Sequence, residues 1–118
     1  MFADKLKNAV HSVKGGEAAI VMGFDGIPVD SFEDKEGFDI ETIGMEFSVV
    51  LKEVRKAADL LETGPAEELM IRTDKIATVL RIVNDDYFVA LALAPDGNMG
   101  KARYLLRLLV PEFRKELT

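Results

Sequence analysis

Few side chains in this sequence have the types and spacing that catalysis needs. His11 is the only histidine, there is no cysteine, and the serines (Ser12, Ser31 and Ser48) stand in no nucleophile-elbow motif. Without cysteine the chain has no disulfide, thiol nucleophile or thiolate metal ligand. A single histidine on an expected helix is typical of a surface residue. We therefore predict no catalytic residues and a protein that is not an enzyme.

Three other groups have chemistry to offer an ion or a phosphate. Asp85-Asp86 resembles a cation-binding pair, but such a pair is usually only a turn. The stretch 97–101 begins a predicted helix and could hold a phosphate on free backbone N–H groups, but it lacks the Walker spacing. Arginines can also act on a partner's phosphates. The candidates are Arg72, Arg81 and Arg103, and the sequence favours solvated surface positions for all three. We predict no metal site and no cofactor.

Length and composition indicate one folded domain over residues 1–118. The chain is 48% hydrophobic and 31% charged, with a net charge of −6. An acidic chain is a poor match for nucleic acid or an anionic membrane surface. The sequence has no apolar run of about 18 residues, and charges stand where a secretory signal needs an apolar block. We expect a cytoplasmic protein without nucleic-acid partners or membrane insertion.

Charge is unevenly spread along the chain. Acidic residues crowd residues 25–46, where Lys35 is the only base, and basic residues predominate from Asn98 onward. Helix-end electrostatics explains part of this pattern, because acids suit a helix start and bases a helix end. It explains Glu33 and Asp34 less well. We interpret the acidic segment as a candidate docking surface for a protein partner, comprising Glu33, Asp34, Glu36, Glu41 and Glu46.

Hydrophobic periodicity predicts three helices and five strands in the order α-β-β-α-β-β-β-α. The expected helices are 2–13, 39–62 and one that begins near 98, and the expected strands are 18–22, 27–32, 68–73, 76–83 and 87–93. Asp25-Gly26 predicts a type I′ hairpin, Asp39 and Asn98 are expected N-caps, and Gly64 is expected to end the long helix. Pro111 predicts a kink near 107–111.

The short connections predict an α+β fold with a five-stranded antiparallel sheet. The segments 20–22 and 88–93 are apolar on both faces and should lie side by side at the centre. The predicted strand order is 2-1-5-4-3. In this three-layer arrangement the long helix covers one face, and the N- and C-terminal helices cover the other.

The long helix carries more apolar surface than one core needs. With 100° per residue, ten small or apolar residues from Ile40 to Leu61 fall in an arc of about 140°, the width of a core-facing stripe. Met45, Val49 and Leu60 lie on the opposite side. Scattered surface apolar residues are normal, so two interpretations remain: an ordinary surface, or a second face for a partner chain.

One edge of the predicted sheet lacks protection. Pro28 blunts the edge strand 27–32, whereas residues 69–73 contain no proline and leave a free edge that can pair with another chain. Together with the outer face of the long helix, this edge predicts a symmetric homodimer. The candidate interface comprises Met45, Val49, Lys52, Lys56, Leu60, Leu69, Met70, Ile71, Arg72 and Thr73.

Several features of the chain form one pattern: the element order, the hairpin 18–29, the long central helix, and the stretches 70–73, 89–91 and 98–103. In this pattern the chain resembles the roadblock (dynein light chain) family, in particular its bacterial MglB-type branch. The resemblance implies a roadblock/profilin-like fold and a homodimer with a continuous two-chain sheet. It also implies binding to a Ras-like small GTPase as regulator or scaffold. Some GTPase-activating members carry a further C-terminal segment, so the resemblance implies binding more directly than activation.

These observations leave two candidate functions. The first is a non-enzymatic regulatory or scaffold homodimer that binds a Ras-like small GTPase. The second is a profilin- or PAS-like sensor with a small molecule between sheet and helix. The sensor needs a cavity of several hundred Å³. The large core-facing residues Phe47, Leu51, Phe88 and Leu105 favour a filled interior instead.

Overall fold

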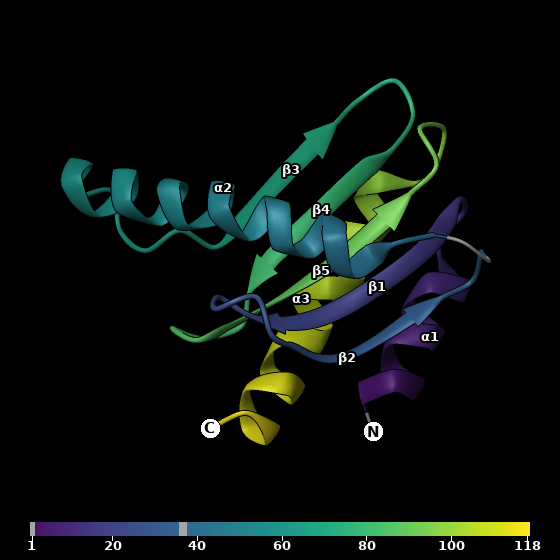
Figure 1. The fold of residues 1–118 in the computed structure, drawn as a ribbon, viewed down its shortest axis with the longest axis horizontal. Helices are drawn as coiled ribbons and strands as arrows, with labels where there is room; N and C mark the ends of the chain where they lie inside the picture. Colours follow the sequence, from purple (N-terminus) through teal and green to yellow (C-terminus); the bar gives the residue numbers. More distant parts are fainter. Residues whose placement is uncertain (1, 36–37) are drawn as a thin grey trace.

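The computed structural model describes residues 2–35 and 38–118 and shows a three-layer α+β fold (Figure 1). The elements are α1 (Phe2–Ser12), β1 (Gly16–Gly23), β2 (Pro28–Glu33), α2 (Ile40–Leu61), β3 (Glu68–Arg72), β4 (Ala77–Ile82), β5 (Tyr87–Leu93) and α3 (Met99–Glu116). The sheet is antiparallel in the order β2-β1-β5-β4-β3, as the sequence predicts. α2 covers one face, and α1 and α3 cover the other.

The two central strands separate two hydrophobic cores, one on each face of the sheet. β1 and β5 are apolar on both faces, and alternate residues enter opposite layers because side chains alternate along a strand. Ala19, Val21 and Leu91 pack toward α1 and α3, whereas Ile20 and Phe88 pack toward α2. All five are fully buried. The prediction that these strands are neighbours at the centre is confirmed.

The ends of α2 are fixed by local hydrogen bonds. At the N-cap, Asp39 Oδ1 accepts the N–H of Thr42 at 3.1 Å, and Oδ2 accepts its hydroxyl at 2.7 Å. These bonds lower the pKa of the Asp39 carboxyl. The helix ends before the expected Gly64, because Glu62 takes the left-handed conformation with φ 55°. The N–H groups of Glu62 and Thr63 then satisfy carbonyls of the last turn.

The β1–β2 hairpin differs from the predicted type I′ turn. Of the central pair, only Gly26 has positive φ, at 87°, whereas type I′ needs it at both positions. The N–H of Gly26 donates to Gly23 O, and the N–H of Gly23 donates to Ile27 O, each at 2.9 Å. The connection is therefore a three-residue loop, 24–26, and the register also shifts between Val21 and Met22.

The last helix runs through its proline. α3 extends from Met99 to Glu116 with Pro111 inside it, and Asn98 caps its start by accepting the N–H of Lys101 at 3.0 Å. Pro111 has no N–H to donate, so the carbonyl of Arg107 loses its usual partner. The helix is not interrupted there. A bend at 107–111 stays a prediction.

Thr78 carries an unpartnered polar group into the sheet core. Its side chain is fully buried, and its hydroxyl has no hydrogen-bond partner among the described residues. An unpaired buried hydroxyl destabilises a fold by about 1–3 kcal/mol. Thr78→Val keeps the shape and removes the hydroxyl. We expect it to raise the free energy of unfolding by about 1 kcal/mol in urea titrations.

A matched threonine provides the control. Thr73 Oγ1 accepts the N–H of Ile76 at 3.2 Å and so supports the β3–β4 turn. Thr73→Val removes that bond and should lower stability. A destabilising effect of Thr78→Val as well would mean that the Thr78 hydroxyl has a hydrogen-bond partner in solution, and it would contradict the prediction.

Candidate functional site

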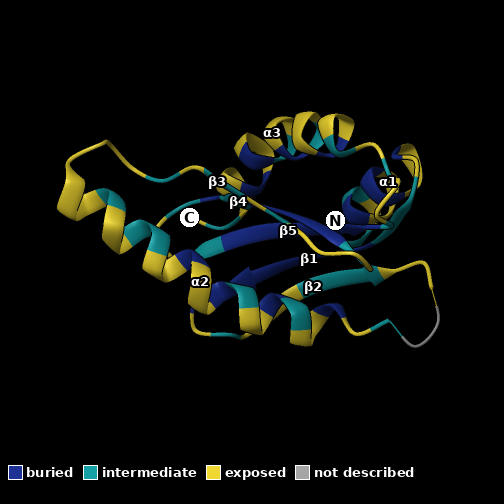
Figure 2. Ribbon diagram, turned by 90° about the horizontal axis from the view of Figure 1, so that it is seen from above, coloured by how far each residue is buried: buried dark blue, intermediate teal, exposed yellow. Residues whose placement is uncertain are grey.

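The second half of α2 extends beyond the sheet that supports its first half. Its buried residues are Ile40, Gly44, Ser48 and Leu51, and no residue of α2 after Leu51 is buried. Figures 1 and 2 show the helix passing the sheet, and in Figure 2 its far half is exposed or only partly buried. Helix length explains this, because 22 residues span about 33 Å. Five strands at about 4.8 Å spacing are only roughly 19 Å wide.

The overhang leaves an apolar stripe uncovered, which we call the α2 seam: Val50, Val54, Ala57 and Leu61. Val50 is 42% and Leu61 72% exposed, and Ala57 is exposed as well. Helical periodicity predicts all four in the core-facing arc, and for these three the prediction is wrong. The spacing along the helix is as predicted, but the sheet does not extend beneath them.

The opposite stripe of α2 lies beside the hairpin. Met45 and Val49 are 49% and 55% exposed, and with Lys52 they line a hollow of about 300 Å³ against the loop 24–26. Lys56 and Leu60 continue this side of the helix and are exposed. Figure 1 shows the hairpin and β3 on opposite sides of α2. The predicted interface residues of α2 therefore do not adjoin β3.

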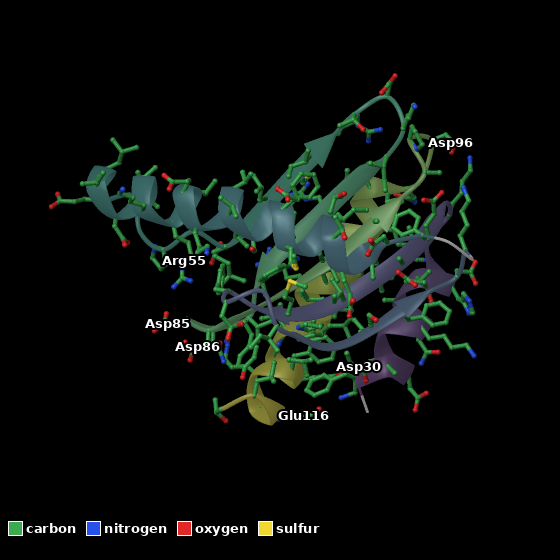
Figure 3. All side chains as sticks on the ribbon, in the orientation of Figure 1. Asp30, Arg55, Asp85, Asp86, Asp96 and Glu116 are labelled. Atoms are coloured by element: carbon green, nitrogen blue, oxygen red, sulfur yellow. The ribbon has the colours of Figure 1, made fainter. Side chains whose placement is uncertain are left out.

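Gly44 brings the first half of α2 close to the sheet. A Cβ at this position would lie 3.2 Å from the Sδ of Met22 and 3.5 Å from Ile20. Further along, the Arg55 guanidinium lies 4.4 Å from the centre of the Phe24 ring and donates to the carbonyl of Asp85 at 3.0 Å. Figure 3 shows Arg55 directed toward Asp85. These contacts fix the direction in which the seam projects.

β3 is an edge strand with β4 as its single neighbour in the sheet. Leu69 and Ile71 are partly buried against the α2-side core, and Met70 on the other face is 47% exposed. Arg72 donates to the carbonyl of Pro95 at 2.6 Å, so this arginine is held within its own chain. The edge offers free backbone groups next to partly covered apolar side chains.

The acidic residues predicted as a docking surface divide into two groups. Glu33 Oε2 accepts the N–H of Ile40 at 2.9 Å, and Asp34 Oδ1 lies 2.9 Å from His11 Nε2, so both hold elements of the fold together. Glu41 and Glu46 are exposed at the start of α2. Glu36 lies outside the described residues.

The part of the chain that the structure describes shows neither a metal-binding cluster nor a membrane-spanning helix. Within residues 2–35 and 38–118 there is no group of three or more His, Cys, Asp or Glu side chains placed to hold a metal ion. In the same part of the chain, no helix is both long enough and apolar enough to span a bilayer.

The sheet order, the long helix on one face and the two terminal helices on the other define a roadblock/profilin-like fold. A Roadblock/LC7 domain from Streptomyces avermitilis has a TM-score of 0.85 at 14% identity, covering 96% of this chain and 94% of that one. MglB from Myxococcus xanthus has a TM-score of 0.79 at 12% identity, covering 98% and 89%.

A closer sequence relationship shows the family. MglC from Myxococcus xanthus is 43% identical to this chain, covers 96% of both chains and has a TM-score of 0.69. This protein belongs to the roadblock family, together with MglC. A comparison with protein-family models gives no match, and a comparison with curated proteins gives none either. The predicted family is confirmed. Of the two Myxococcus xanthus proteins, MglC is 43% identical to this chain, whereas MglB is 12% identical.

Proposed function

We propose that this protein is a non-enzymatic homodimer that binds a Ras-like small GTPase as a regulator or scaffold. The observation that carries the proposal is the uncovered α2 seam, together with the free edge of β3. The resemblance to the roadblock family, which implies dimers that bind such GTPases, supports the identity of the partner. Binding to a GTPase of this class implies a cytoplasmic protein.

The uncovered surface is apolar, so covering it with a second copy of the chain is more favourable than leaving it in water. In a twofold arrangement, β3 pairs with β3 of the other copy, and the α2 seams pack against each other. Leu69, Ile71 and the seam would then be buried together, as in the apolar interfaces of obligate dimers. In this arrangement the seam replaces Met45 and Val49 as the centre of the helix contact.

The GTPase would meet the exposed acids at the start of α2. Glu41 and Glu46 are exposed and free to contact it, whereas Glu33 and Asp34, although exposed as well, are held by the N–H of Ile40 and by His11. Charged groups at the rim of an interface mainly set the association rate and partner choice. Met45 and Val49 lie beside Glu46 in the hairpin hollow and would add apolar contact.

The test is calorimetry against the Ras-like GTPases encoded in the same genome, each loaded with GDP or a non-hydrolysable GTP analogue. We expect one of them to bind with an affinity that depends on the nucleotide. Glu46→Lys should weaken that binding about tenfold. The matched control is Asp96→Lys, an exposed acid in the β5–α3 loop. Absence of binding by every GTPase in both nucleotide states would contradict the partner that we propose.

The sensor interpretation finds no support in the interior. Met22, Leu51 and Phe88 are fully buried and fill the space between the sheet and α2. The hollow of about 300 Å³ next to α2 lies at the rim, against the hairpin loop.

A further inference from the structure

The face of the sheet opposite α2 carries a positively charged hollow on an acidic protein. The hollow has a volume of about 170 Å³ and lies where α3 meets the β3–β4 edge. Its lining residues are Glu68, Arg81, Gly100, Arg103, Tyr104 and Arg107. Three guanidinium groups therefore face one carboxylate, in a chain whose net charge is −6.

The single carboxylate is shared by two of the arginines. Glu68 and Arg81 are cross-strand neighbours, and Arg81 Nη1 donates to Glu68 Oε2 at 3.0 Å. Arg103 Nε donates to the other oxygen, Oε1. Glu68 thereby raises the pKa of Arg103 and neutralises one positive charge. Both side chains of the Glu68–Arg81 pair are mostly buried, so the pair is a fixed part of the wall.

Arg107 adds a further positive charge, and this charge has no partner in the hollow. It is exposed, lines the same hollow and has no hydrogen bond or ion pair with any residue that the structure describes. An arginine has five N–H donors in a planar fork that matches a carboxylate. With Arg81 and Arg103 sharing Glu68, the hollow has a net positive charge and donors left for an anion.

Apolar surface adjoins this hollow across α3. Tyr104 and Leu108 are 54% and 52% exposed and lie one helical turn apart on the outer side of α3. Leu108 also lines a groove of about 260 Å³ between α1 and α3, together with Leu105, Leu109 and the Lys5–Glu112 ion pair. A cationic hollow and an apolar groove therefore flank the same helix.

We infer that the outer face of α3 is a docking surface for an acidic segment of a partner protein. A carboxylate of that segment enters the hollow beside Arg107, and a bulky apolar side chain enters the groove between α1 and α3. The two positions are separated by the thickness of a helix, about 10 Å. An extended chain covers this distance in about three residues, so the motif is an acidic residue about three positions from an apolar one.

The chemistry of this face favours a peptide over an anionic membrane. Glu112 and Glu116 lie on the groove side, where Lys5 pairs with both, and a flat anionic surface would meet these carboxylates. A hollow of 170 Å³ takes one carboxylate rather than a headgroup layer. Arg107 and Leu108 lie on α3, across the sheet from α2, so this inference goes beyond the proposed dimer and its GTPase.

The test is selection from a phage-displayed library of random peptides, followed by affinity measurement with a labelled peptide from the selected pool. We expect enrichment of Asp or Glu near Leu or Phe. Arg107→Glu should weaken binding of the selected peptide about tenfold or more. Leu108→Ser should weaken it as well, because the groove loses an apolar wall. Thermal unfolding shows whether each variant is folded.

Lys101→Glu is the matched control. It makes the same charge change on the same helix outside the hollow, and it should leave the affinity within about threefold. A pool without acidic enrichment, or equal binding by the Arg107→Glu variant, would overturn the inference. Binding to phosphatidylserine vesicles without binding to acidic peptides would do so too. A Val50→Glu variant, altered only in the α2 seam, should still bind the peptide, so failure of the dimer is distinguishable from failure of this surface.

Discussion

Val50→Glu is expected to separate the proposed homodimer into single folded chains. Val50 is 42% exposed at the point where α2 leaves the sheet, so a glutamate there does not enter the chain's own core. In the proposed dimer the twofold axis would bring two such carboxylates into an apolar seam, where each would be desolvated without a partner. We expect the dissociation constant to rise about 100-fold, which corresponds to roughly 2.7 kcal/mol. Sedimentation equilibrium measures it directly.

The neighbouring residue serves as the matched control. Val49 is 55% exposed and lies on the hairpin side of α2, about 100° from Val50 around the helix. The sequence alone predicts Val49 in the interface, whereas the seam predicts a much smaller effect for Val49→Glu than for Val50→Glu. The reverse order would show that the chains meet through the hairpin side. Cooperative thermal unfolding of both variants establishes that each is folded, so that the difference concerns association.

Gly16→Ala should strongly destabilise the fold, although it adds only one methyl group. A Cβ at Gly16 would lie 2.2 Å from the carbonyl oxygen of Val10, in the last turn of α1, and 3.2 Å from that of Val13, just after the helix. Backbone atoms cannot turn aside as a flexible side chain does, so α1 must shift from the sheet. We expect a loss of about 3 kcal/mol in the free energy of unfolding. Urea unfolding measures it.

Gly100→Ala is the same type of substitution, but we expect it to raise the free energy of unfolding rather than lower it. Its Cβ would meet only Asn98 Oδ1, at the ordinary contact distance of 3.6 Å, in the first turn of α3. Alanine is the better helix former by up to about 1 kcal/mol, so stability should rise slightly. A Gly16→Ala variant as stable as wild type would mean that α1 is not packed against β1 as the structure has it.

Local patterns in the sequence determine most of this fold. Alternation along residues 76–83 identifies one strand, the continuous apolar run 88–93 identifies another with two covered faces, and short connections make the sheet antiparallel. The N-caps Asp39 and Asn98 also follow from residue type and position, because their oxygens accept N–H groups three residues on. The strand order follows once the two doubly buried strands are placed at the centre.

Other features depend on distances between elements, which the periodicity of the sequence does not give. The α2 seam has the spacing of a core stripe, and only the width of the sheet shows that Val50 and Leu61 lie beyond it. The ratio of helix length to sheet width is the signal that reveals the overhang. Glu33 appears in the sequence as one acid in a charged loop, yet it bonds to the N–H of Ile40. The hollow around Arg107 joins residues from β3, β4 and α3, and no local pattern connects them.

The mass of the wild-type protein in solution is the decisive test of the homodimer. Size-exclusion chromatography with multi-angle light scattering gives this mass without reference to molecular shape. At tens of micromolar we expect a single species with twice the 13.0 kDa mass of one chain. A single species of 13.0 kDa at that concentration would show that the overhanging half of α2 remains uncovered in water, and it would contradict the homodimer.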